Sequence, residues 1–200
     1  MSKKNAETRQ IKIILLGESG VGKTCIINRY FENKFSADTE STLGSYSTTK
    51  TIVKNKIKYI VDIWDTTGQE KYHSITNLYI KGSNIVILVY SIDSKSTFDK
   101  LNYWYDSVKD KIEGDDYVLA VVGSKYDLFE SEEVPDEEAK KYAEEKNAIF
   151  QLVSAKSNIE GVTKLFDTLI DEFINRYNNK ERKGNHLTVS ESGKHKKKIC

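Results

Sequence analysis

The chain has 200 residues, of which 38% are hydrophobic and 30% are charged, and its formal net charge is +1. A chain of this length can bury most of its apolar surface around one core, so we expect one domain. The charges are unevenly distributed: residues 178–200 carry seven Lys or Arg against two Glu, net +5, whereas residues 1–177 have a net charge of −4. A mildly acidic body argues against nucleic-acid binding, and a basic tail favours contact with an anionic surface.

The sequence lacks the apolar segments that would direct it into or across a membrane. Residues 1–8 have no apolar core and are expected to be a flexible N-terminus, and no later run approaches the length of a membrane span. The two cysteines, Cys25 and Cys200, are too few for a disulfide scaffold. We therefore expect a protein that folds in the cytoplasm with reduced thiols.

The first predicted strand, residues 11–16, leads into a glycine-rich loop and then a helix. The loop has the pattern G-x-x-x-x-G-K-[ST], which in this setting predicts a phosphate-binding loop rather than an ordinary glycine-rich turn. Glycines let backbone N–H groups approach phosphate oxygens, and the helix N-terminus adds partial positive charge. Lys23 would bind the β- and γ-phosphates, and the Thr24 hydroxyl would ligate Mg²⁺. The candidate phosphate-binding residues are Ser19, Gly20, Val21, Gly22, Lys23, Thr24 and Cys25.

The rest of the chain alternates strand and helix patterns. The first helix is expected to end near Asn33, and residues 37–47 fit a mobile loop. Further strands are predicted at residues 48–53 and 57–64, which form an antiparallel hairpin, and at residues 85–90, 117–122 and 149–153. Further helices are predicted at residues 98–112, around residues 136–143 and at residues 159–177. This order predicts an α/β sandwich with a mainly parallel sheet and ligands at the carboxyl ends of its strands.

Four further motifs follow the phosphate loop in a fixed order. They are Thr42, Asp65-Thr66-Thr67-Gly68-Gln69-Glu70, Ser124-Lys125-Tyr126-Asp127 and Ser154-Ala155-Lys156. Phe35 lies eleven residues after Thr24, Thr42 seven after Phe35, and Asp65 twenty-three after Thr42. Over residues 9–177 the chain resembles the Ras-like small GTPases. Within them it is most similar to the Rab family, through residues 63–65, 71–76, 79–82 and 88–92.

This resemblance implies a fold and a set of ligands. The fold is the P-loop NTPase small-GTPase fold: a three-layer sandwich with a mostly parallel six-stranded sheet, one antiparallel strand and about five helices. The ligands are GTP or GDP with Mg²⁺. Asp127 would accept the two neighbouring N–H donors of guanine, which adenine does not offer. Lys125 would lie along the base, Phe35 would cover its edge, and the N–H of Ala155 would meet its O6. Ser124, Ser154 and Lys156 complete the two base-binding motifs.

The resemblance also implies a metal site and a switch. Thr24, Thr42, phosphate oxygens and waters held by Asp65 would surround Mg²⁺. Thr42 would bind the metal only while the γ-phosphate holds residues 37–47 in place. Gly68 would bind the γ-phosphate, and Gln69 would be the catalytic residue that orients the attacking water. No arginine finger is evident, so we expect unaided hydrolysis to be slow and an activating protein to supply the missing charge.

Three positions depart from the family pattern. Thr67 replaces an alanine, and it either slows hydrolysis or is a tolerated substitution. Ser124 replaces an asparagine that reaches both the base and the phosphate loop; because serine is too short for both, we expect weaker nucleotide binding and faster GDP release. Ser47 replaces an aromatic residue that helps to form the effector surface with Trp64 and Tyr79, so the choice of partner stays open.

The tail at residues 178–200 is predicted to be disordered and basic. Cys200 is the last residue, whereas a C-a-a-X box needs its cysteine four residues from the end, so a Rab-type prenylated cysteine is the better match. One lipid anchors weakly, but Lys194, Lys196, Lys197 and Lys198 would add attraction to an anionic leaflet. The alternative is an incidental cysteine on a solvated tail.

The leading interpretation is a monomeric GTPase that converts GTP and water to GDP and phosphate. As a Rab-type switch it would regulate vesicle and membrane traffic by binding effectors in the GTP state through residues 37–47, Trp64 and residues 66–82. The implied partners are a guanine-nucleotide exchange factor, a GTPase-activating protein, a prenyl escort protein and a GDP-dissociation inhibitor. The expected location is the cytoplasm, reversibly attached to the cytosolic face of an endomembrane or the plasma membrane.

Two alternatives stay open. One is a binding module that does not hydrolyse GTP and stays loaded with it, which Thr67 favours and Gln69 opposes. The other is a phosphate-loop ATPase or nucleotide kinase, which Asp127 and Ser154-Ala155-Lys156 oppose.

Overall fold

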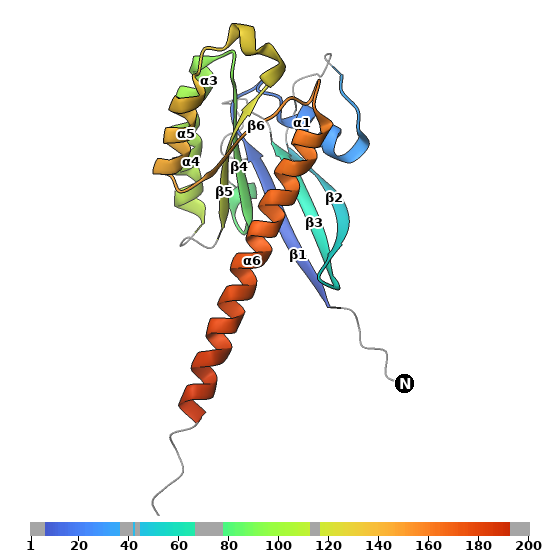
Figure 1. Cartoon of the computed structure of the whole chain (residues 1–200), viewed down its shortest axis with the longest axis vertical. Helices are drawn as coiled ribbons and strands as arrows, with labels where there is room; N and C mark the ends of the chain where they lie inside the picture. The colour runs from blue at the N-terminus through green and yellow to red at the C-terminus, as the bar shows by residue number, and fades with distance from the viewer. Residues whose placement is uncertain (1–6, 37–41, 43–44, 67–77, 113–116, 193–200) are drawn as a thin grey trace, which may run out of the picture.

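The computed structural model describes residues 7–36, 42, 45–66, 78–112 and 117–192, with side chains described as far as Lys180 (Figure 1). The strands are β1 (Thr8–Leu16), β2 (Ser45–Lys54), β3 (Ile57–Thr66), β4 (Ile85–Ser91), β5 (Val118–Ser124) and β6 (Ile149–Leu152). The helices are α1 (Lys23–Glu32), α3 (Lys95–Asp99), α4 (Leu101–Lys111), the 3-10 helix η2 (Tyr126–Ser131), α5 (Asp136–Glu145) and α6 (Ile159–Ser192).

The strands form one sheet in the order β2-β3-β1-β4-β5-β6. Strand β2 pairs antiparallel with β3, and the other neighbouring strands pair in parallel. Strands β4 and β5 are buried at every position, which explains their nearly continuous apolar sequence. The predicted fold, a mostly parallel six-stranded sheet with one antiparallel strand, is confirmed.

Helices cover both faces of this sheet and create two apolar cores. Alternate residues of the central strands point to opposite faces, so Ile13 and Leu15 belong to one core and Ile14 and Leu16 to the other. The first core includes residues of α1 and α6, and the second includes residues of α3, α4 and α5. Figure 1 shows α6 on one side of the sheet and α3 to α5 on the other. The three-layer arrangement therefore follows from apolar strands with two covered faces.

Two helices differ from the sequence-based expectation. The helix predicted at residues 98–112 is two helices, α3 and α4, which meet at Lys100. Helix α6 continues to Ser192, whereas the sequence predicts disorder from residue 178. Its side chains are buried at intervals as far as Ile174, and Lys180 is exposed. Residues 178–192 contain no proline, and each residue added to a helix forms a further backbone hydrogen bond, so the backbone can stay helical beyond the apolar pattern.

No helix in the part of the chain that the structure describes is long and apolar enough to cross a membrane.

The carboxyl ends of the parallel strands lie along one edge of the sheet. The loops that follow β1, β4, β5 and β6 leave the sheet there, because parallel strands share one direction. The carboxyl end of β3 lies at the same edge, since β3 is parallel to β1. The fold thus gathers at one edge the segments that carry the predicted motifs.

Truncating the most deeply packed aromatic residue of α6 should destabilise the whole domain. Phe166 is fully buried and its ring stacks on Tyr30 of α1 with 4.1 Å between centroids. Phe166→Ala should lower the free energy of unfolding by about 3–5 kcal/mol, because it removes buried apolar area and leaves a cavity. The same substitution at Phe129, which is 59% exposed, should change it by less than about 0.5 kcal/mol. Urea unfolding measures both, and equal losses would contradict this assignment of the core.

Candidate functional site

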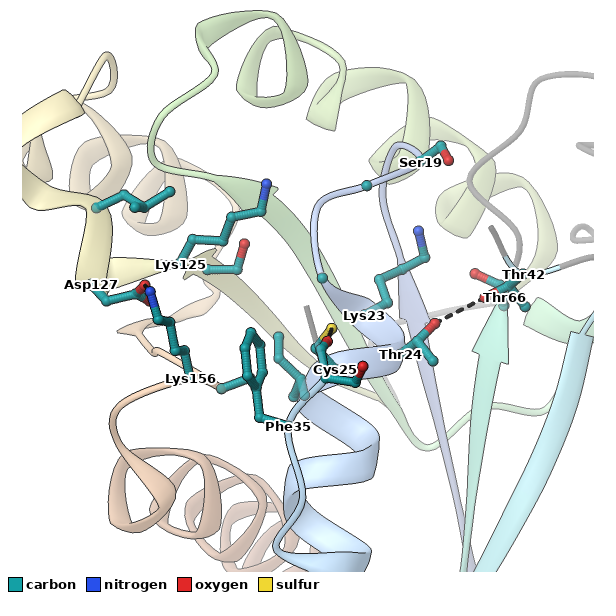
Figure 2. A pocket seen from close by; sticks show the side chains of 17 residues that line it. Ser19, Lys23, Thr24, Cys25, Phe35, Thr42, Thr66, Lys125, Asp127 and Lys156 are labelled. Carbon is teal, nitrogen blue, oxygen red and sulfur yellow. Dashed lines mark hydrogen bonds and ion pairs between the residues drawn. The ribbon is translucent and has the colours of Figure 1, made fainter. Parts of the chain in front are cut away.

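A cavity of about 420 Å³ opens at the carboxyl edge of the sheet (Figure 2). Most of the candidate ligand-binding residues line it: Ser19, Gly20, Gly22, Lys23, Thr24, Cys25, Phe35, Thr42, Ser124, Lys125, Asp127, Ala155 and Lys156. Figure 2 shows two ends, with Lys23, Thr24 and Thr42 at one and Phe35, Asp127 and Lys156 at the other. The structure therefore brings segments that are far apart in the sequence around one space.

Some candidate residues lie elsewhere. Val21 is fully buried behind the cavity wall, and Ser154 and Asp65 lie behind wall residues to which they are hydrogen-bonded. Gly68, Gln69 and Cys200 lie outside the described residues, as do Thr67 and most of residues 37–47. The wall also contains Thr66, which belongs to one of the sequence motifs but was given no role, and three residues outside the motifs: Ile26, Ser36 and Leu128.

The phosphate loop requires glycine at two points. Gly17 has a φ of +147°, and a Cβ built on it would lie 2.1 Å from Val89 O, so the loop passes directly against β4. Gly22 has a φ of +95° at the N-cap of α1, in the left-handed region that side chains disfavour. These two glycines place the start of α1, with its unpaired N–H groups, against the cavity.

Lys23 is held inside the loop. Its Nζ donates hydrogen bonds to Gly17 O at 2.7 Å and to Glu18 O at 2.8 Å, and the residue is only 5% exposed. Burial lowers the pKa of Lys23 to about 8, against the opposing charges of Asp65 and Glu18, which raise it. A buried ammonium group with two carbonyl partners provides a fixed positive charge for an anion in the cavity.

The opposite end of the cavity contains an oriented carboxylate. Asp127 Oδ1 accepts a hydrogen bond from Ser154 Oγ at 2.5 Å, and Lys156 Nζ lies 3.8 Å from Asp127 Oδ2. Ser154 Oγ in turn accepts from the backbone N–H of Ser157 at 3.0 Å. Each carboxylate oxygen has two lone pairs, so Asp127 keeps acceptor capacity toward the cavity. Ser154 therefore orients Asp127 rather than lining the cavity itself.

Arg29 is a further residue that the motifs did not identify. It lies on α1, and its Nε donates to Ala155 O at 2.6 Å while its other nitrogens reach Lys156 O and Asn33 O at 3.2 and 3.0 Å. Arg29 thus joins α1 to the loop that follows β6. Its main partner is 126 residues away in the sequence, so no local pattern could have indicated this role.

Ser124, the last residue of β5, connects the end of the cavity that contains Asp127 with the phosphate loop. Its Oγ lies 2.5 Å from Val21 O and 2.8 Å from Tyr90 O. A serine hydroxyl has one proton, so it can donate to only one of these two carbonyl oxygens at a time. The short side chain therefore reaches the phosphate loop, and its single proton is already committed to the backbone.

Two hydroxyls and a carboxylate form a group suited to a hard cation. Thr24 Oγ1 donates to Asp65 Oδ2 at 2.7 Å. It also lies 2.9 Å from Thr42 Oγ1 (Figure 2). Asp65 Oδ1 is buried and has no hydrogen-bond partner among the described residues. Burial raises the pKa of Asp65, an effect opposed by hydrogen bonds from Thr24 and Tyr46 and by the charge of Lys23. Oxygen ligands and an unsatisfied carboxylate oxygen fit Mg²⁺ with its waters.

The aromatic surface beside the cavity is smaller than the family pattern predicts. The rings of Trp64 and Tyr79 pack with 4.8 Å between centroids, and Lys12 Nζ lies 5.3 Å from the Trp64 ring. Ser47 is the register partner of Trp64, so a small side chain stands beside this aromatic pair. Tyr46 instead pairs with Asp65, and its side chain therefore points to the opposite face of the sheet.

Comparison with known proteins identifies the family. Residues 12–175 match the model of the Ras family. The Ras-related protein Rab-17 of Mus musculus is 38% identical over 82% of this chain and 76% of its own length. The Ras-related protein Rab11A of Lotus japonicus is 35% identical over 91% and 82%, and the GTP-binding protein YPT52 of Saccharomyces cerevisiae is 34% identical over 90% and 92%. The chain therefore belongs to the Ras family of small GTPases, as a member of Rab type.

Proposed function

We propose that this protein is a molecular switch that binds and hydrolyses GTP and, in its GTP state, recruits effectors that act in vesicle and membrane traffic. The observation that carries this proposal is the cavity. It is lined by the phosphate loop, by the hydroxyls of Thr24 and Thr42, which suit a metal ion, and by the carboxylate of Asp127, which Ser154 orients. Its volume of about 420 Å³ is within the range of about 300–1,000 Å³ that is usual for small-molecule sites. A nucleotide has a phosphate end and a base end that match the two ends of this cavity.

At the base end, the selectivity for guanine would come from Asp127. Its carboxylate would accept the N1–H and N2–H of guanine, whereas adenine presents no such pair of donors. Ser154 restrains Asp127 through Oδ1, and Arg29 restrains the Ala155 backbone, whose N–H would meet the guanine O6. Such restraint lowers the entropy cost of reading the base.

At the phosphate end, Lys23 and the backbone N–H groups at the start of α1 would hold the phosphates. Thr24 and Thr42 would hold Mg²⁺ directly and Asp65 through water, and the ion would neutralise phosphate charge. Thr42 precedes β2 and is 18 residues from Thr24, its hydrogen-bond partner. A γ-phosphate that favours this contact would therefore fix the segment before β2, and its loss would release that segment to change the effector surface.

Hydrolysis would depend on Gln69 and on an external activator. Gln69 would orient the attacking water, and Gly68 would donate its N–H to the γ-phosphate. Among the described side chains, no arginine lines the cavity, and the Arg29 guanidinium is bound to backbone carbonyls near the base end. An activating protein that inserts an arginine would supply the missing positive charge at the γ-phosphate.

Membrane attachment would use the end of the chain. Cys200 would carry a prenyl group, added with the help of an escort protein, and the preceding lysines would bind an anionic leaflet. A GDP-dissociation inhibitor would extract the lipidated GDP form into the cytoplasm, and an exchange factor would return it to the GTP form. The intact mass of protein from its native cells, with and without a prenyl group, tests this part.

The nucleotide that copurifies with the protein tests the proposed function directly. Chromatography of the released nucleotide should find GDP, because slow hydrolysis would convert bound GTP during purification. Asp127→Ala should lose guanine nucleotide, since it removes the two acceptor contacts to the base. Bound GTP would instead favour the non-hydrolysing module, and an adenine nucleotide would contradict guanine selectivity and favour the ATPase or kinase.

Restoring asparagine at position 124 should slow nucleotide release. An asparagine amide has two protons and a carbonyl oxygen, so it can contact the phosphate loop and the base together. Ser124→Asn should reduce the dissociation rate of a fluorescent GDP by about five- to tenfold, the effect of about one added hydrogen bond. Ser107→Asn on α4 is a control, because its hydroxyl bonds only within that helix, to Tyr103 O. Equal dissociation rates for wild type and Ser124→Asn would contradict the expectation.

Thr67 should slow hydrolysis if its branched side chain hinders closure of Gly68 on the γ-phosphate. Thr67→Ala should then raise the single-turnover hydrolysis rate by about tenfold, a change of about 1.4 kcal/mol in the barrier. Gln69→Ala in the same background should abolish the gain, because it removes the residue that orients water. An unchanged rate in Thr67→Ala would show that the threonine is merely tolerated.

A further inference from the structure

Glu18, the second residue of the phosphate loop, is hydrogen-bonded to helix α4, which covers the face of the sheet opposite α1 and α6. Trp104 of α4 donates a hydrogen bond from its indole Nε1 to Glu18 Oε1 at 3.1 Å. Trp104 is only 1% exposed and belongs to the apolar core beneath α3 to α5. A buried indole N–H needs an acceptor, so this core fixes the position of the Glu18 side chain.

Glu18 lies at a sensitive point of the loop. It directly follows Gly17, whose backbone passes against β4, and its own carbonyl oxygen accepts a hydrogen bond from Lys23 Nζ. The residue therefore has two roles that oppose each other. Its backbone helps to hold the lysine that faces the phosphates, while its side chain brings a negative charge into a loop whose ligand is an anion.

Like charges a few ångströms apart repel, and the repulsion is stronger where water is excluded. The bond from Trp104 holds the Glu18 carboxylate toward α4. A hydrogen bond to an ionised acceptor is stronger than one between neutral groups, so it can set the orientation of a half-buried side chain. Without this donor, the carboxylate would be free to turn toward the phosphates.

We propose that Trp104 is a positioning residue for nucleotide retention: its hydrogen bond to Glu18 keeps a loop carboxylate away from the bound phosphates. This inference rests on the proposed nucleotide binding and adds to it a residue outside the cavity wall. Trp104 acts through Glu18 and does not touch the nucleotide. Loss of the indole donor therefore weakens nucleotide retention only while residue 18 carries a charge.

Two substitutions and their combination test this charge dependence. Trp104→Phe removes the donor but keeps an aromatic ring, and it should raise the dissociation rate of a fluorescent GDP by about five- to tenfold. Glu18→Gln removes the charge and keeps an acceptor for the indole, so its own rate is the reference for the double variant. The double variant should release GDP no faster than Glu18→Gln, because no carboxylate remains to turn toward the phosphates.

A structural role alone would not produce this rescue. If Trp104→Phe merely loosened the core, the double variant would release GDP as fast as Trp104→Phe does. Tyr105→Phe is the matched control on α4: it also removes a polar group from an aromatic side chain, and the Tyr105 ring lies beneath Lys109 and Lys146 rather than beside the phosphate loop. It should leave the rate unchanged.

An independent measurement follows the bond itself. The chain has two tryptophans, so its nuclear magnetic resonance spectrum contains two indole N–H signals; Trp64→Phe identifies the signal of Trp64, and the other belongs to Trp104. Glu18→Gln should shift the Trp104 signal and leave that of Trp64 in place. An unshifted Trp104 signal would overturn the inference even if Trp104→Phe failed to fold.

The two proposals fail in different ways. A wild-type protein that retains no guanine nucleotide would contradict both of them. A wild type that retains GDP, together with an unchanged rate in Trp104→Phe, would contradict only the role of Trp104.

Discussion

The buried ammonium group of Lys23 is the interaction on which the rest of the site depends. An ionised lysine is stable inside a protein only when carbonyl groups or opposite charges compensate for lost water. Here the loop wraps around the side chain, and the carbonyl groups of Gly17 and Glu18 point inward to meet it. The same loop places Ser19, Gly20 and Gly22 along the cavity, where their backbone N–H groups would meet an anion. One backbone conformation of the loop thus compensates the buried Lys23 ammonium group and also provides a site for an anion.

The cavity is assembled from loops, and side-chain to backbone hydrogen bonds join these loops to one another. Ser124 reaches Val21 O in the phosphate loop, and Arg29 reaches Ala155 O in the loop after β6. Ser154 then restrains Asp127, which follows β5. Each bond spans two elements, so hydrogen bonds join the two ends of the cavity. The Thr24–Thr42 contact differs, because it joins two side-chain hydroxyls and no backbone group.

Local patterns in the sequence predict the parts of this structure that depend on local chemistry. Glycine spacing predicts the phosphate loop, a charged motif after an apolar run predicts the place of Asp127, and continuous hydrophobicity predicts the parallel strands. Each of these signals lies within a short stretch of the sequence. The contacts of Arg29 and Trp104 escaped prediction because their partners lie 126 and 86 residues away. The length of α6 escaped prediction for another reason: the apolar periodicity of the sequence ends at Tyr177, whereas the helical backbone continues to Ser192. Gln69 and Thr67 stay predictions.

The length of α6 has a geometric consequence for the proposed attachment at the end of the chain. Helix α6 leaves the domain at the end opposite the loop between β1 and α1 (Figure 1), and Ile174 is its last buried residue among the described side chains. From there to Ser192 the helix adds about 1.5 Å per residue, or roughly 27 Å. If the proposed lipid anchor at Cys200 were present, this length of helix would separate the packed part of α6 from the segment that carries the lipid. The cavity, at the other end of the domain, would then face away from the membrane.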